Sequence, residues 1–414
     1  MYALISMFFA LALLVALLHF KVRIGRAMMI SAFALAILLR VTPEKFWDAI
    51  VTEWNDVPLS QTTGYLFVSL TALVMLVNVL GIVMQETGVS QKLSPALHGL
   101  FRSRRFALAA IPMMMGMLPT PGGIMLSAPM VRELGDHIGV ERSRQAAINY
   151  FFRHQWETVW PLFPSIPLIQ HMLGISAFAL ISHNLALSLT GIVSGVVFLL
   201  LFGIPPKGKE KHTHAQFIHN LINFGHAFWP ILFVAILYAA TNIHPAVGLA
   251  IAIPIFLYCH KVPTKRWAEF FKSGFSFDFA LLIFGALLFK INLEAGNAIE
   301  QVVTFLTEMN VPQNFVIFFL PFLVAFLTGL TMPTVAITFP FLLPYIGTGQ
   351  DTLIGLETLA FSGLVCGLLL TPVHLCLALS ASYFETPLPK IILRFFGPVI
   401  FIACAGILMA IFFG

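Results

Sequence analysis

Three ionisable residues stand close together in an apolar segment of this 414-residue chain: Arg153, His154 and Glu157. A charged side chain at the centre of a bilayer costs about 2.5–3.5 kcal/mol on insertion scales, so such residues are functional candidates. Arg153 and Glu157 are four positions apart and would share one face of a helix. Arg153 could bind an anionic group through paired N–H donors, and Glu157 could bind a cation or carry a proton. His154 titrates in a range suited to proton coupling.

These residues also have a structural interpretation. Arg153 and Glu157 could form an internal ion pair that holds the helix in its bundle, and His154 could be a buried ring bonded to the backbone. Their helix is expected to break at Pro161, because Pro cannot continue the hydrogen-bond ladder. The equivalent break in the second half of the chain reads Thr371-Pro372-Val373-His374.

Two other apolar segments are interrupted by Pro and Gly, which lower helix stability. The interruptions read Thr120-Pro121-Gly122-Gly123 in the first half and Thr331-Met332-Pro333-Thr334 in the second. Broken backbone at membrane depth lines a cavity or is buried in protein, and paired breaks are typical of a transporter's binding site. The Thr hydroxyls could contact an anion or a cation such as Na⁺, or could only cap the half-helices.

The composition predicts an all-α polytopic membrane protein. Hydrophobic residues make up 59% of the chain and charged residues 10%, against about 25% charged in soluble domains. Apolar windows predict about ten transmembrane helices, each near 20 residues long. The windows cover residues 2–20, 24–40, 64–84, 146–170, 176–203, 216–240, 244–260, 275–291, 355–382 and 393–413. The two interrupted stretches, near 106–135 and 312–349, are predicted to be re-entrant helical hairpins.

The charges predict the orientation of these helices. Basic residues cluster in four loops, within 21–26, 92–105, 207–211 and 260–266. The positive-inside rule places these loops in the cytoplasm, so we expect a multi-pass protein of a prokaryotic cytoplasmic membrane with both termini outside. The net charge of +5 belongs to these loops and predicts no nucleic-acid partner. The four cysteines have no metal-ligand spacing and are predicted to be packing residues.

The breaks also indicate an internal repeat. A shift of 211 residues lays Thr120 on Thr331 and Pro161 on Pro372. The same shift sets His374 opposite a Phe, so the two halves would differ chemically. The alternative is that apolar, Pro-rich helices align at many offsets. The shift predicts two inverted five-helix repeats, residues 1–204 and 216–414, joined by a cytoplasmic linker at 205–215.

Hairpin tips at Thr120 and Thr331, followed by helices broken at Pro161 and Pro372, resemble the ion transporter superfamily, in an uncharacterised prokaryotic branch. That superfamily includes dicarboxylate, citrate, gluconate and lactate permeases and some sodium/proton antiporters. The resemblance implies an elevator-like slide of a transport unit against a scaffold, often in a homodimer. The tips lack the Ser-Asn-Thr signature of the dicarboxylate branch. The resemblance therefore implies a transport mechanism but does not specify the substrate.

These features predict a secondary active transporter for a small, anionic, carboxylate-like organic solute, driven by H⁺ or Na⁺ through alternating access. The alternative is a Na⁺/H⁺ antiporter of the same fold, in which Glu157 and hairpin carbonyls bind Na⁺. An enzyme is not favoured, because the chain has no zinc motif, nucleophile elbow, P-loop or sizeable soluble domain. No cofactor is predicted apart from the coupling ion.

Overall fold

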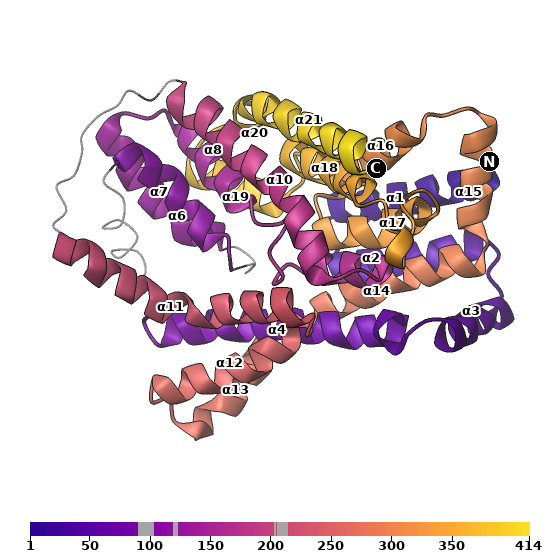
Figure 1. The fold of residues 1–414 in the computed structure, drawn as a ribbon, viewed down its shortest axis with the longest axis horizontal. Helices are drawn as coiled ribbons and strands as arrows, with labels where there is room; N and C mark the ends of the chain where they lie inside the picture. Colours follow the sequence, from indigo (N-terminus) through magenta and orange to yellow (C-terminus); the bar gives the residue numbers. More distant parts are fainter. Residues whose placement is uncertain (90–102, 119–122, 203, 205–213) are drawn as a thin grey trace.

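The computed structural model of the chain is helical throughout the part that it describes. It describes residues 1–89, 103–118, 123–202, 204 and 214–414, which contain helices and connecting turns but no strand. The helices form two groups that share an interface (Figure 1). The first group contains the helices that precede each hairpin, and the second contains the hairpins and the helices that follow them.

The first group is built around α14 (Phe277–Ala295), which packs along α2 (Ile24–Leu38) and also contacts α4 (Thr63–Glu86). α12 (Pro245–Cys259) and α13 (Thr264–Gly274) pack on α4. The remaining members are α1 (Tyr2–His19), α3 (Pro43–Asp56), α11 (His214–Thr241) and α15 (Ala298–Glu308).

The second group is built around α18 (Ile354–Leu370), which packs between α16 (Gln313–Thr328) and α21 (Phe396–Phe413). Gly363 and Gly367 let α18 approach α16 closely, since a Cβ atom on either would lie 2.1 or 2.2 Å from a carbonyl oxygen of α16. The other members are α6 (Arg104–Met115), α7 (Ile124–Ile138), α8 (Arg142–Arg153), α9 (Ser165–Leu173), α10 (Ala177–Gly195) with a π-helical end (Val196–Leu201), α17 (Thr331–Ile346), α19 (Leu375–Tyr383) and α20 (Leu388–Ile392).

Six helical segments among the described residues are long and apolar enough to cross a membrane. The number rises to eight if two bent pairs each form one span: α2 with α3, bent by 109°, and α13 with α14, bent by 47°. The chain is therefore a polytopic helical membrane protein. The predicted total of about ten spans is larger, because it also counts α12, which has only 15 residues, and the segment 146–170.

The prediction of one helix over 146–170 with a break at Pro161 was wrong in its details. α8 ends at Arg153, turns occupy 154–164, and α9 begins at Ser165. Pro161 has no N–H, and its ring clashes with the carbonyl four residues earlier, that of Glu157. This clash excludes a regular helix that runs from Glu157 through Pro161, and α8 ends four residues earlier still, at Arg153. The predicted common helical face of Arg153 and Glu157 therefore does not exist.

Both hairpins consist of two packed helices joined at the predicted interruption. α16 ends at Thr328 and is followed by Gly329, whose φ of +67° lies in the left-handed region that glycine adopts without strain, and α17 begins at Thr331. α6 and α7 form the first hairpin, with Gly123 immediately before α7. Thr120, Pro121 and Gly122 of its tip lie outside the described residues, as do positions 205–213 of the predicted linker.

Three amphipathic helices, α3, α13 and α15, were not predicted. α3 begins in a way that its sequence explains, because Thr42 accepts a hydrogen bond from the backbone N–H of Lys45 and Pro43 occupies the first helical position. A search for continuous apolar windows misses such helices, since their polar faces lower the average hydropathy. The two inverted repeats stay a prediction, although the order of helices around the second hairpin follows that around the first.

Candidate functional site

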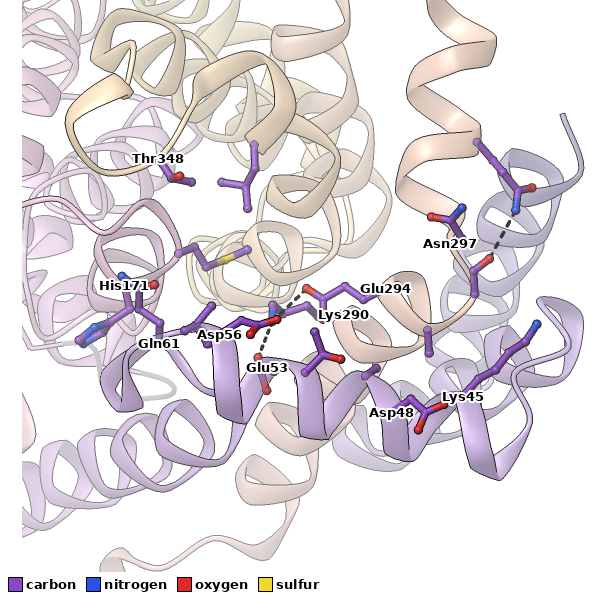
Figure 2. Close-up of a pocket in the computed structure, with 18 residues that line it drawn as sticks. Lys45, Asp48, Glu53, Asp56, Gln61, His171, Lys290, Glu294, Asn297 and Thr348 are labelled. Carbon is purple, nitrogen blue, oxygen red and sulfur yellow. Dashed lines mark hydrogen bonds and ion pairs between the residues drawn. The ribbon is translucent and has the colours of Figure 1, made fainter.

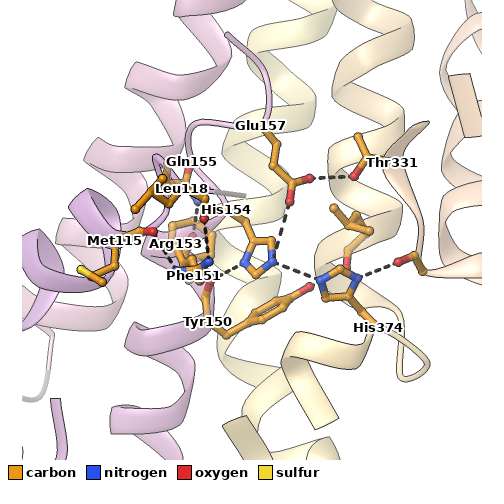
Figure 3. Close-up of polar contacts among 12 residues, drawn as sticks. Met115, Leu118, Tyr150, Phe151, Arg153, His154, Gln155, Glu157, Thr331 and His374 are labelled. Carbon is orange, nitrogen blue, oxygen red and sulfur yellow. Dashed lines mark hydrogen bonds and ion pairs between the residues drawn. The ribbon is translucent and has the colours of Figure 1, made fainter. Parts of the chain in front are cut away.

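Three interrupted segments meet at one group of buried and half-buried polar side chains, here named the central cluster: Arg153, His154, Glu157, Thr331 and His374. Figure 3 shows His154, Glu157, Thr331 and His374 pointing toward one another, from the turn after α8, the start of α17 and the break between α18 and α19, while Arg153 points from the end of α8 toward Met115 and Leu118. Arg153, His154 and Glu157 are each 5–6% exposed. The predicted convergence of the second hairpin tip and both broken helices is therefore observed in the described residues.

Two histidines form the middle of the central cluster. The Nε2 atoms of His154 and His374 are 3.1 Å apart. The Nδ1 atom of His154 lies 2.6 Å from the carbonyl oxygen of Tyr150, and that of His374 lies 2.6 Å from the carbonyl oxygen of Gly329. Both rings are thus anchored to the backbone, as the structural interpretation of His154 expected, and their other nitrogens face each other.

Glu157 lies beside this pair. The Thr331 hydroxyl donates to its Oε2 at 2.8 Å, and its Oε1 lies 3.8 Å from Nε2 of His154. The carboxylate therefore connects the turn after α8 with the first residue of α17. A hydroxyl and an imidazole contact it, and the described residues place no Lys or Arg within ion-pair distance of it.

Arg153 is bound by carbonyl oxygens at the end of α6. Its Nη1 donates to Met115 at 2.9 Å and its Nη2 to Leu118 at 3.0 Å. The indole N–H of Trp156 donates to Met113 in the same turn at 2.8 Å. The last carbonyls of a helix lack intrahelical partners and carry partial negative charge, so a guanidinium there satisfies both needs. The predicted ion pair of Arg153 with Glu157 is absent from the described contacts.

Two predicted threonines have structural partners instead. Thr334 donates to the carbonyl of Leu330 at 2.6 Å, and Thr371 donates to that of Phe326 at 2.5 Å. The Thr334 hydroxyl bonds to the backbone at the start of its own helix, α17, and the Thr371 hydroxyl links the end of α18 to α16. Other predicted residues contribute backbone shape: Gly123, Pro161, Met332 and Pro333 are buried, and Pro372 is exposed at the second break.

A family model with the description "Protein of unknown function (DUF401)" matches residues 2–413. The chain belongs to this family. The match includes both groups of helices and the whole central cluster. A search of curated proteins finds no match to this chain.

A second polar region of this DUF401 member was not predicted. The acidic cavity is a space of about 870 Å³ between α3, α14 and the start of α15, with His171 and Thr348 on its opposite wall (Figure 2). Lys290 donates to Glu53 at 2.9 Å and to Glu294 at 3.1 Å. Glu53 also accepts from the backbone and hydroxyl of Thr63, at 3.0 and 2.8 Å. A Lys inside the predicted helix 275–291, with a Glu four residues later, was the signal for this region.

Glu357 was also missed. It lies in α18 and is fully buried. Its Oε1 accepts from the side chain of Asn184 in α10 at 3.1 Å, while its Oε2 has no partner in the described part of the chain. A lone Glu three residues inside an apolar helix was the signal that could have identified it.

Proposed function

We propose that the chain is a secondary active transporter that moves a small anionic organic solute, such as a carboxylate, across a prokaryotic cytoplasmic membrane. The observation that carries this proposal is the meeting of interrupted helices at one buried cluster of ionisable side chains. In transporters, discontinuous helices at the bilayer midplane form the substrate site. Buried charges at such positions are expensive and mark the path of a solute or ion.

Arg153 is the residue that binds the anion in this proposal. Carbonyl dipoles hold its guanidinium, and no carboxylate neutralises it among the described contacts. α7 and α17, the second helices of the two hairpins, both begin without a side-chain N-cap. Uncapped helix starts present N–H donors and partial positive charge, which favour an anionic ligand.

Glu157 provides the opposite charge for a coupling cation, H⁺ or Na⁺. Its carboxylate and the hydroxyl of Thr331 place three oxygen atoms near one another at the start of α17. Oxygen ligands suit a hard cation such as Na⁺. An anionic solute beside Arg153 and a cation beside Glu157 would attract each other, so each would lower the free-energy cost of burying the other's charge. The binding, and hence the transport, of the two would then be coupled.

The movement in this proposal is an elevator-type slide of the second group of helices against the first. The central cluster belongs entirely to the second group, so a rigid displacement of that group would carry the cluster with its ligands. The first group would then be the scaffold, and we propose that it also forms a homodimer. Both termini face outward in this arrangement.

Uptake into proteoliposomes tests the proposal. A panel of labelled carboxylates is offered under imposed proton or sodium gradients, and at least one should accumulate. Arg153→Ala should lower that uptake at least tenfold, because a charge-assisted hydrogen bond is worth about 1.5–3 kcal/mol. Arg132→Ala is the matched control, since Arg132 is a partly exposed residue of α7 outside the cluster. No accumulation under any gradient, or full uptake by Arg153→Ala, would contradict the proposal.

The second candidate is a Na⁺/H⁺ antiporter of the same architecture. The contact between Glu157 and Thr331 favours it, because both provide oxygen ligands. It predicts sodium-dependent proton flux in proteoliposomes that contain no organic solute, and Glu157→Gln should abolish this flux. Flux that requires an added carboxylate would exclude this candidate.

A further inference from the structure

The histidine pair of the central cluster has an unusual hydrogen-bond pattern. Nδ1 of His154 and Nδ1 of His374 each lie 2.6 Å from a backbone carbonyl oxygen. A carbonyl oxygen only accepts, so each Nδ1 must carry the hydrogen. In a neutral imidazole the other nitrogen then has a lone pair and no hydrogen. Both Nε2 atoms are therefore acceptors in the neutral rings.

Two acceptors cannot hydrogen-bond to each other, yet these Nε2 atoms are 3.1 Å apart. A positive species between them would remove the repulsion of the lone pairs. A metal ion fits this spacing, since two nitrogens at 2.0–2.1 Å from a tetrahedral ion are about 3.3 Å apart. The carbonyl contacts at Nδ1 are also the usual outer partners of metal-binding histidines, because they set the tautomer and the ring orientation.

Two further ligands lie close by. Sγ of Cys376, in the first turn of α19, belongs to a group with the two imidazoles in which the ligand atoms all lie within 4.8 Å of one another. Cys376 forms no disulfide. Oε1 of Glu157 is 3.8 Å from Nε2 of His154, while Oε2 is held by Thr331. Small side-chain rotations would bring all four donor atoms to one ion.

We infer that His154, His374, Cys376 and Glu157 form a binding site for a divalent transition-metal ion of the zinc or cobalt type. Imidazole and thiolate ligands favour these ions over Mg²⁺ or Ca²⁺, which prefer oxygen alone. The thiol of Cys376 loses its proton when the ion binds, so thiolate and carboxylate together neutralise the dication. Charge neutrality matters here because His154 and Glu157 are buried, and an uncompensated charge beside them is costly.

This inference goes beyond the proposed transport function and does not rest on it, since metal binding is measured on the purified protein. The ion would tie the turn after α8 to the start of α19, and through Thr331 and Gly329 to the second hairpin. No local sequence pattern indicates this site, because His154 lies 220 positions from His374.

Cobalt is the probe, because a tetrahedral Co²⁺ ion with a thiolate ligand has visible absorption bands and a near-ultraviolet sulfur-to-cobalt charge-transfer band. The full chain is purified in detergent with an affinity tag that lacks histidine, stripped with a chelator and titrated with Co²⁺. We expect one ion per chain with both spectral features. Cys376→Ser should abolish the charge-transfer band, and His374→Asn should weaken binding about tenfold or more.

Cys404→Ser and His183→Asn are the matched controls, since both residues lie outside the central cluster and should leave the spectrum unchanged. Gel filtration and thermal unfolding establish whether each variant is folded. If His374→Asn does not fold, the spectrum of Cys376→Ser alone tests the inferred metal site. Co²⁺ should also raise the unfolding temperature of the unmodified chain. Absence of binding by the stripped chain, or a thiolate band that survives Cys376→Ser, would overturn the inference.

Discussion

The central cluster and the acidic cavity both bury ionisable side chains, but they balance charge in opposite ways. In the acidic cavity, the Lys290 ammonium contacts two carboxylates, at 2.9 and 3.1 Å, which neutralise its charge. In the central cluster, Arg153 contacts carbonyls and Glu157 contacts a hydroxyl and an imidazole. The two charges lie close in sequence without neutralising each other.

This difference separates a structural role from a binding role. A buried charge that has its counter-ion holds helices together, and its loss leaves the partner exposed to the full cost of desolvation. A buried charge without a counter-ion is a site that a ligand can complete. Lys290 connects α14 to α3 and to the start of α4, whereas the central cluster lies where the backbone is interrupted.

The largest effect on stability is expected for Lys290→Met. The substitution leaves Glu53 and Glu294 without their cation, and breaking a buried ion pair costs about 3–5 kcal/mol. Denaturant titration in detergent micelles measures the loss in the free energy of unfolding.

Lys45→Met is the control for Lys290→Met, because Lys45 borders the same cavity and has no ion pair in the described residues. Its free energy of unfolding should change by about 0.5 kcal/mol or less. Adding Glu53→Gln to Lys290→Met should recover part of the loss, since it removes an uncompensated charge. If Lys290→Met is as stable as the original chain, the acidic cavity does not have the structural role that distinguishes it from the central cluster.

The next effect compares two carboxylates. Glu294→Gln removes one partner of Lys290 and should lower the free energy of unfolding by about 1–3 kcal/mol. Glu157→Gln keeps an acceptor for Thr331, so its stability should change by less than about 1 kcal/mol, while solute uptake falls at least tenfold. Unfolding titrations and proteoliposome uptake are measured on both variants. The comparison fails if Glu157→Gln is the less stable of the two and transports normally.

Much of the fold could be predicted because a membrane imposes simple requirements. Every backbone group in the bilayer must be satisfied within its own segment, so long apolar runs such as α1, α4 and α10 become helices near their predicted boundaries. A search for long apolar runs does not find amphipathic helices such as α3, because one of their faces is polar. The end of α8 was misplaced because Pro161 excludes regular helix over the turn before it, and α8 ends four residues before that turn, at Arg153.

The site was predictable to the extent that single residues carry a signal. Arg153, Glu157 and Thr331 could be found, because charges in apolar segments are rare and Thr331 lies at a predicted interruption, but their contacts could not. The carbonyls at the end of α6 and the hydroxyl of Thr331 are brought there by packing of distant helices. Lys290 and Glu53 are 237 positions apart, so no local pattern indicates their contact.

A smaller effect compares two threonines of α17. Thr331 donates to Glu157, whereas Thr334 donates to a carbonyl of its own helix start. Thr331→Val should lower solute uptake about fivefold, as expected for a hydrogen bond worth about 1 kcal/mol. Thr334→Val should change uptake less than about twofold, because its partner is structural. Equal losses in the two variants would show that Glu157 does not need this hydroxyl.

The smallest effect concerns the opposite end of α8, where Glu141 forms an ion pair outside the membrane-spanning segments. A hydrogen bond from Ser143 and the charge of Arg394 lower the pKa of Glu141 below its ordinary value of 4.5, despite partial burial. A lowered pKa means that the ionised carboxylate stabilises the fold above pH 4.5 and that this contribution disappears as the pH falls through the lowered value. Glu141→Gln should therefore unfold at a slightly lower temperature than the original chain near neutral pH, and the difference should vanish in acid. Glu133→Gln, at an exposed position of α7, should show no such convergence. Because Glu141 is exposed, this ion pair should contribute little to stability. A difference as large as that of Lys290→Met would mean that burial does not determine how strongly a paired charge stabilises the packing of these helices.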